Sequence, residues 1–267
     1  MRPPAAPDTH AITTSLWAIL KTFLFTTVRL VDCVLKTLLF VSPPPITLST
    51  AASLSHPRTT FDLTRTALRT LSYLSFIFPR FGGVSSTASS ALPELLRTFY
   101  TGLDVLSSDA EESQHFVREI CAQTSTLGRV EEINARKGVL LAKQAFALAS
   151  VEQLVPVLGD CTIRTDVYPL CEPYVVSRFA RFLLSEMYRH LNDPTHRETY
   201  ESAHSVMLAI FSAHAKAQKA GVTPTIPNAS IGTKQLSFAE QIIPAYARCL
   251  VSVRFLRIHC TRTVGTD

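Results

Sequence analysis

Residues 152–160, which read EQLVPVLGD, constrain the fold of this chain more than any other stretch. They predict an apolar helix that starts at a capping box from Ser150 to Gln153, carries Pro156 and ends at Gly159-Asp160. The similar segment EQIIPAY follows at residues 240–246. Between the two segments, amphipathic patterns alternate with short breakers. The chain is therefore expected to be all-α, an irregular array of antiparallel helix pairs of the α-solenoid, HEAT-like type; chance recurrence of the segment is the alternative.

The composition supports a helical and strongly apolar protein. Apolar residues make up 46% of the 267 residues and charged residues 18%, below the usual quarter of a globular domain. Nine glycines disfavour a turn-rich β-protein. Such a chain is deeply packed, membrane-associated or covered by partners.

The net charge is uneven along the chain: +5 in residues 1–80, −4 in residues 81–160 and +4 in residues 161–267. Residues 1–80 hold eight basic and three acidic side chains. This excess favours an anionic membrane face or nucleic acid, whereas the scattered positions favour solvated arginines between helices. Basic clusters interleaved with aromatic residues are missing, so we expect no nucleic-acid binding.

The N-terminal region predicts an amphipathic apolar helix over residues 11–41, after a disordered stretch at 1–10. Lys21 interrupts the apolar run, which argues against a signal peptide. Lys21, Arg29, Asp32 and Lys36 fall within about 80° on a helical wheel, and Asp32 can pair with Lys36 and Arg29. The wide apolar arc fits a core helix, an interfacial membrane helix or a helix that docks on a partner.

Beyond this helix we expect a Pro-rich linker at 42–58, a helical array at 59–250 and a basic tail at 251–267. The array helices are predicted at 61–78, ended by Pro79, and at 92–107, 129–149 and 197–219. A further helix follows the Ser108–Glu111 capping box. Asp193-Pro194 predicts a helix start, and Ser237 with Glu240 predicts the cap of the last helix. Because no helix closes the array after Leu250, we expect it to be truncated or closed by a partner.

Motifs for catalysis and metal binding are absent. No H-E-x-x-H, G-x-S-x-G, Rossmann or Walker pattern occurs. His204 and His214 are expected to be half-buried packing residues, and the pairs Arg65/Arg69 and Glu111/Glu112 to be solvated or capping charges. The six cysteines lack metal-site spacing and are expected to be reduced and mostly buried. We therefore expect no catalytic, cofactor-binding or metal-binding residues, no cofactor and no enzymatic activity.

Residues 193–212 (DPTHRETYESAHSVMLAIFS), together with the EQLVP and EQIIPAY segments, resemble the fungal peroxin eight family. That family is a helical, membrane-associated component of peroxisomal matrix-protein import, which links receptor docking to later receptor handling from the lumenal face. The chain departs from the family in ending at residues 264–267 (VGTD) without a Ser-Lys-Leu signal, in being shorter than expected, and in what reads as an insertion at 175–191.

The resemblance implies a noncatalytic scaffold that is peripheral to the peroxisomal membrane. Its expected partners are other proteins of the import machinery and, through residues 11–41, a membrane surface. The alternative is an integral or monotopic membrane protein of another organelle, anchored by residues 11–41.

Overall fold

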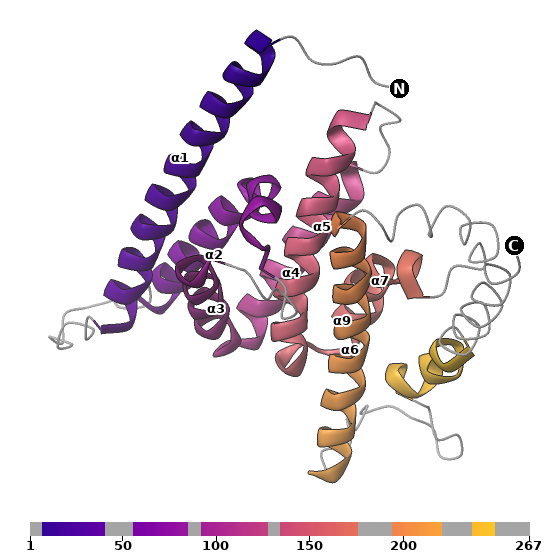
Figure 1. Ribbon diagram of the computed structural model, residues 1–267. Coiled ribbons are helices and arrows are strands. Elements are labelled where there is room, and N and C mark those ends of the chain that lie inside the picture. The colour runs from indigo at the N-terminus through magenta and orange to yellow at the C-terminus, as the bar shows by residue number, and fades with distance from the viewer. Residues whose placement is uncertain are drawn as a thin grey trace, which may run out of the picture.

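The computed structural model describes residues 7–40, 56–84, 92–127, 134–175, 194–220 and 237–248. The regular structure in these ranges is helical throughout (Figure 1), which confirms the predicted all-α array. The HEAT-like geometry of its pairs stays a prediction. The basic tail at 251–267, most of the 42–58 linker and most of the 175–191 insertion lie outside the described residues.

The first helix, α1 (Pro7–Phe40), begins earlier than the predicted residue 11. Residues 7–10, which we expected to be disordered, form its first turn, because a proline at the start of a helix loses no internal hydrogen bond. The next helix, α2 (His56–Tyr73), likewise begins inside the expected linker.

The prediction that a helix over 61–78 ends at Pro79 is wrong. The α-helix ends at Tyr73, and the 3-10 segment η1 (Ser75–Phe81) continues through Pro79. The turn ends at Gly82 and Gly83, whose φ values of 86° and 75° favour glycine. Gly83 N–H donates to the Phe78 carbonyl at 3.0 Å, which closes this end. The glycine pair is therefore a helix cap that turns the chain toward α3 (Pro93–Ser107).

Helix α4 (Ala110–Leu127) begins one residue later than the predicted Ser108–Glu111 capping box implies, so the prediction of Ser108 as its cap is wrong. The cap is Asp109, whose Oδ1 accepts the Glu112 N–H at 3.0 Å. Four apolar residues of this helix are buried: Phe116, Val117, Ile120 and Cys121.

The stretch at 152–160 does not begin a helix. Helix α5 (Asn134–Leu154) runs through Ser150, whose buried Oγ donates to the Phe146 carbonyl of the same helix at 2.9 Å. The serine is therefore an interior residue and not a cap. Pro156 lies in the short 3-10 segment η2 (Val155–Val157), which ends the helix.

After this break, three segments follow one another directly: α6 (Asp160–Thr162), the π-helical η3 (Ile163–Val167) and α7 (Tyr168–Val175). Pro169 has no N–H for the carbonyl four residues earlier, so the α-helical ladder is interrupted where the π turn lies. The π turn therefore accommodates the backbone hydrogen bond that Pro169 cannot make.

Helix α9 (Pro194–Lys219) begins at the proline that the sequence predicts. A last helix covers residues 238–248, and its capping box is confirmed by two bonds. Ser237 N–H donates to Glu240 Oε2 at 2.8 Å, and Glu240 N–H donates to Ser237 Oγ at 3.3 Å. Here Pro244 lies inside a helix, whereas Pro156 follows one, so the two similar segments are not equivalent structural repeats.

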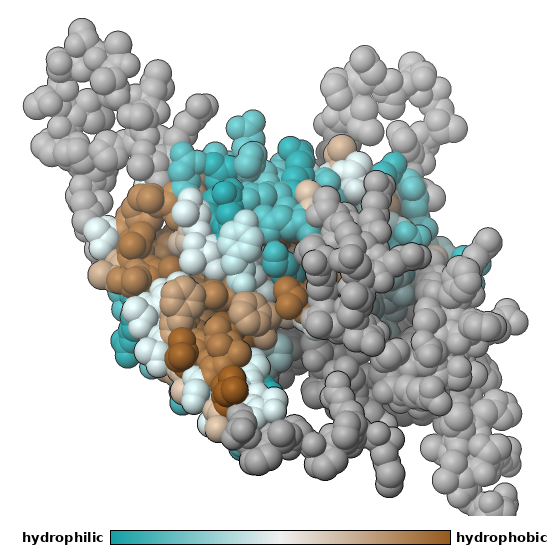
Figure 2. Space-filling model, turned by 90° about the horizontal axis from the view of Figure 1, so that it is seen from above, coloured by the Kyte–Doolittle hydropathy of each residue, from teal (hydrophilic) through white to brown (hydrophobic). Residues whose placement is uncertain are grey.

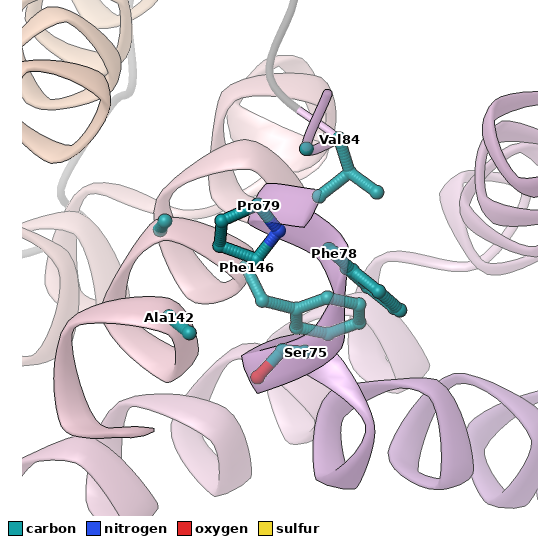
Figure 3. Close-up of a pocket in the computed structure, with 8 residues that line it drawn as sticks. Ser75, Phe78, Pro79, Val84, Ala142 and Phe146 are labelled. Atoms are coloured by element: carbon teal, nitrogen blue, oxygen red, sulfur yellow. The ribbon is translucent and has the colours of Figure 1, made fainter. Parts of the chain in front are cut away.

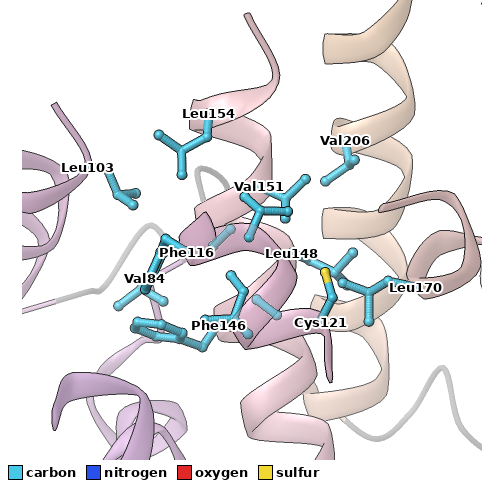
Figure 4. Close-up of a cluster of buried hydrophobic side chains, with 14 of the residues drawn as sticks. Val84, Leu103, Phe116, Cys121, Phe146, Leu148, Val151, Leu154, Leu170 and Val206 are labelled. Atoms are coloured by element: carbon cyan, nitrogen blue, oxygen red, sulfur yellow. The ribbon is translucent and has the colours of Figure 1, made fainter. Parts of the chain in front are cut away.

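Helix α5 is the centre of the core. It packs against α9, α4, η1 and α3, and Figure 1 shows α5 and α9 side by side. Figure 4 shows its buried side chains meeting those of its neighbours, such as Val206 of α9 and Leu170 of α7. Phe146 forms edge or tilted contacts with Phe99 of α3 (ring centroids 5.2 Å apart) and Phe78 of η1 (6.2 Å). One continuous cluster of buried apolar residues extends from α1 to the last helix.

Glycine at position 102 allows α2 and α3 to cross closely. A Cβ there would lie 2.9 Å from Leu68 Cδ2 and 3.1 Å from its Cγ. We expect Gly102→Ala to lower the free energy of unfolding by about 1–2 kcal/mol, because the overlap outweighs the helix-propensity gain. Gly138→Ala in α5 is the matched control, since its Cβ would meet no atom within 4 Å. We expect it to stabilise by about 0.5–1 kcal/mol in urea unfolding; an equal effect of both variants would contradict this account.

Candidate interaction surface

Helix α1 presents two apolar faces. One face packs into the core against α2, α3 and η1 through Leu24, Val28, Val31 and Leu35, which are at most 7% exposed. The other face is exposed and forms a line that we call the α1 outer stripe: Ile12, Leu16, Ile19, Phe23, Leu30 and Val34, between 41% and 68% exposed. Figure 2 shows hydrophobic side chains gathered along this side of the molecule. The arc predicted from the sequence is therefore part core and part surface.

Two sets of polar and aromatic contacts hold α1 against the body. Asp32 is 7% exposed and accepts Lys36 Nζ at 2.7 Å, as predicted. Its second partner is Arg97 of α3, at 3.3 Å, and among the described residues Arg29 makes no ion pair with it. Arg80 of η1 lies 4.6 Å over the Trp17 ring. These contacts fix which face of α1 is left outward.

The charges expected to be solvated on α2 and α4 instead join the two helices. Arg65 Nε lies 3.5 Å from Glu112 Oε2, and Arg69 Nε lies 2.5 Å from Glu119 Oε1. The Arg65 side chain is 16% exposed, so the expectation of a wholly solvated face is wrong for it. The pKa of Arg69 is raised, and its hydrogen bond to Glu119 is the largest cause of this shift. These ion pairs join α2 to α4. Because their charges are already paired within the fold, little charge remains to bind a ligand.

The last helix docks on α9 through two histidines. His204 Nδ1 lies 2.9 Å from the Tyr246 hydroxyl, and His214 Nε2 lies 3.3 Å from Ser237 Oγ. His204 packs between Tyr200 and Tyr246, with ring centroids 4.4 and 5.6 Å away. Its buried Nε2 has no hydrogen-bond partner among the described residues. The expected half-buried packing role of both histidines fits these contacts.

Burial of His204 predicts a stability that depends on pH. Burial lowers the pKa of this imidazole, so the folded chain binds its proton at lower pH than the unfolded chain does. Above the unfolded pKa, about 6.5, both states are neutral; as pH falls below it, the unfolded state gains the proton first and stability falls. We expect the drop in urea midpoint on acidification to shrink in His204→Asn, whose amide can replace Nδ1. Equal drops in both proteins would contradict this assignment.

A small cavity lies between η1 and α5 (Figure 3). It leaves space of about 10 Å³, that of about one water molecule, and is lined by Ser75, Phe78, Pro79, Gly83, Val84, Ala142, Ala145 and Phe146. The buried Ser75 Oγ has no hydrogen-bond partner among the described residues. The cavity is too small for an organic cofactor.

The cysteines divide into two groups, so the expectation that they are mostly buried is wrong for half of those described. Cys121 and Cys171 are buried, and Cys33 and Cys161 are exposed. Burial raises the pKa of Cys121 to about 12 and raises that of Cys171 as well, so both stay protonated and unreactive at neutral pH. Across the described parts of the chain, no three His, Cys, Asp or Glu side chains gather as a metal site would require. The expected lack of catalytic, cofactor and metal residues stays a prediction.

One described stretch, Gly138–Val157, is long and apolar enough to cross a membrane by length and composition alone. It belongs mainly to α5 and is 61% buried inside the fold. Helices at the centre of a core have the same composition. We therefore assign it to the core.

A comparison with models of known protein families finds a match over the helical region around α5. Residues 113–212 match the family model described as PEX8 central TPR-like domain. The match spans α4 to most of α9 and includes the α5–α9 contact. It confirms the resemblance to the peroxin eight family, and it describes the array there as TPR-like. No curated protein and no solved structure matches the chain.

Proposed function

We propose that this chain, which carries the central TPR-like domain of the peroxin eight family at residues 113–212, is a noncatalytic scaffold of peroxisomal matrix-protein import. It links proteins of the import machinery and lies peripheral to the peroxisomal membrane. The observation that carries the proposal is the family match, which covers the part of the array centred on α5. Arrays of stacked helices expose extended surfaces that suit protein binding.

Four features of the described residues support a binding role over catalysis. The one cavity described above has room for about a single water, and the buried thiols stay protonated. The charged pairs between α2 and α4 join helices and do not converge on a pocket. The α1 outer stripe is apolar and exposed, and an exposed apolar surface of this kind is typical of an interaction site.

Co-purification tests the scaffold role. We expect the tagged full chain, isolated from gently solubilised peroxisomes, to retain proteins of the import machinery. Leu208→Asp, at a side chain 58% exposed on α9, is expected to keep the fold. Co-purification with this variant tests whether that side of α9 binds import proteins. Isolation of the intact chain without any import protein would refute the proposal.

The second candidate is a monotopic or integral membrane protein of another organelle, anchored by residues 11–41. The exposed outer stripe of α1 favours membrane contact in either case. Carbonate extraction separates the modes of attachment: we expect release into the supernatant, as for a peripheral protein. Retention in the pellet would favour the integral alternative.

A further inference from the structure

We infer that the α1 outer stripe inserts in the plane of an anionic phospholipid surface. The inference rests on the peripheral membrane placement proposed above, and it names the element, its orientation and the lipid class. Four observations carry it: the geometry of the stripe, the bonded state of its neighbouring hydroxyls, the charges beside it and the position of the protein body.

The stripe has the dimensions of an interfacial helix. Its six side chains fall within about 60° on the helical wheel and extend over about 33 Å along the axis from Ile12 to Val34. Helices that lie in a membrane interface bury their apolar face about 5–10 Å deep. The stripe can thus enter lipid along its length while the helix axis stays parallel to the surface.

Five of the seven threonine hydroxyls of α1 donate to its own backbone. Each donates to the carbonyl four residues earlier, at 2.7–3.0 Å: Thr13, Thr14, Thr22, Thr26 and Thr37. A hydroxyl that is bonded inside its helix does not need water, so moving it into an apolar medium costs less. Thr26 and Thr37, which lie within about 50° of the middle of the stripe, therefore oppose insertion less than free hydroxyls would.

The charges beside the stripe are mainly positive. Arg29 and Lys36 lie about 110° and 130° from the middle of the stripe, so their long side chains can extend to the headgroups when the stripe is inserted. Arg97 of α3 joins Lys36 at Asp32. Arg29, Lys36 and Arg97 against the one carboxylate of Asp32 leave this flank at +2. Anionic headgroups complement such a flank.

The body of the protein does not block the stripe. The packed face of α1, marked by Leu24 and Leu35, is turned about 120° from it, so α2 and α3 lie beside the approach and not across it. A second copy docked through the same stripe would bring two basic flanks together. Beyond the first turn of α1, which holds Asp8, Asp32 is the acidic residue of this helix that could offset them, and that carboxylate already has two cations. The charges therefore favour lipid over a second copy.

Co-sedimentation of the full chain with vesicles tests the inference. We expect binding to vesicles of phosphatidylcholine with phosphatidylserine and much weaker binding to phosphatidylcholine alone. Ile19→Glu with Phe23→Glu, at positions 65% and 56% exposed, is expected to weaken binding at least tenfold. Arg29→Gln is expected to weaken it about fivefold, because one basic residue near the surface is lost. The matched control Leu208→Glu on α9, 58% exposed, should bind as the parent does.

Three outcomes would overturn the inference. They are no binding to either vesicle, equal loss in the Leu208→Glu control, and a solution dimer that crosslinks through the exposed Cys33 and is abolished by the Ile19/Phe23 variant. The last would assign the stripe to a second copy. Failure of vesicle binding leaves the scaffold proposal intact if import proteins still co-purify. Conversely, vesicle binding without such proteins would leave the inference standing and remove the scaffold role.

Discussion

Replacement of Phe146 by alanine is expected to destabilise the chain by about 3–5 kcal/mol. Its ring is 1% exposed and contacts rings from two other elements, Phe99 of α3 and Phe78 of η1. Removing it deletes a large apolar side chain and leaves a cavity where α3, α5 and η1 meet, next to the existing small one. Because a typical domain is stable by only about 5–15 kcal/mol, this loss is a large fraction of the total.

Urea unfolding followed by circular dichroism measures the effect. We expect the midpoint to fall with little change in the denaturant dependence. Phe23→Ala is the matched control, since the same ring is removed from a position 56% exposed on the outer stripe. It should leave the midpoint in solution nearly unchanged. A loss below about 1 kcal/mol for Phe146→Ala would contradict the central place given to α5.

Introduction of a charge between α5 and α9 is expected to have the largest effect. Val206 of α9 is fully buried, and Val206→Asp would place a carboxylate in an apolar interface without a partner. We expect a loss of more than about 4 kcal/mol, enough to unfold the family-matched region at room temperature. The expected signature is loss of helical circular dichroism and rapid proteolysis.

Leu208→Asp gives the matched comparison two residues along the same helix. That side chain is 58% exposed, so the same chemical change should leave helicity unchanged and the free energy of unfolding within about 0.5 kcal/mol of that of the parent. If Val206→Asp stayed folded, or if both variants unfolded alike, the α5–α9 contact would not have the structural role assigned to it.

Local signals in the sequence predicted several helix starts correctly. The Asp193-Pro194 start of α9 and the reciprocal bonds of Ser237 and Glu240 depend only on residues a few positions apart. Such caps can be identified without knowing what packs nearby. The all-α class was predictable for a related reason, since apolar spacing at the helical period recurs along the chain.

Similar local patterns failed where burial decided the outcome. Ser150 fits a capping box, but it lies inside α5 because the helix continues under the packing of α9 and η1. Pro79 was expected to stop a helix, and a 3-10 turn accommodates it instead. Neither result can be read from a short window of residues.

The interaction surface was predictable only in part. A helical wheel shows that α1 is apolar over a wide arc, but the packing of α2 and α3 decides which part stays exposed. The same limit applies to Asp32, whose partner Arg97 lies 65 residues away in the chain. Contacts of that separation leave no local signal in a single sequence.

The location of the full chain in living cells tests the proposed function most directly. A fluorescently tagged copy, with the tag placed so that both ends are examined in turn, is imaged beside a peroxisome marker. We expect punctate signal that coincides with the marker. Diffuse cytosolic signal, or coincidence with a different organelle, would contradict a role in peroxisomal import.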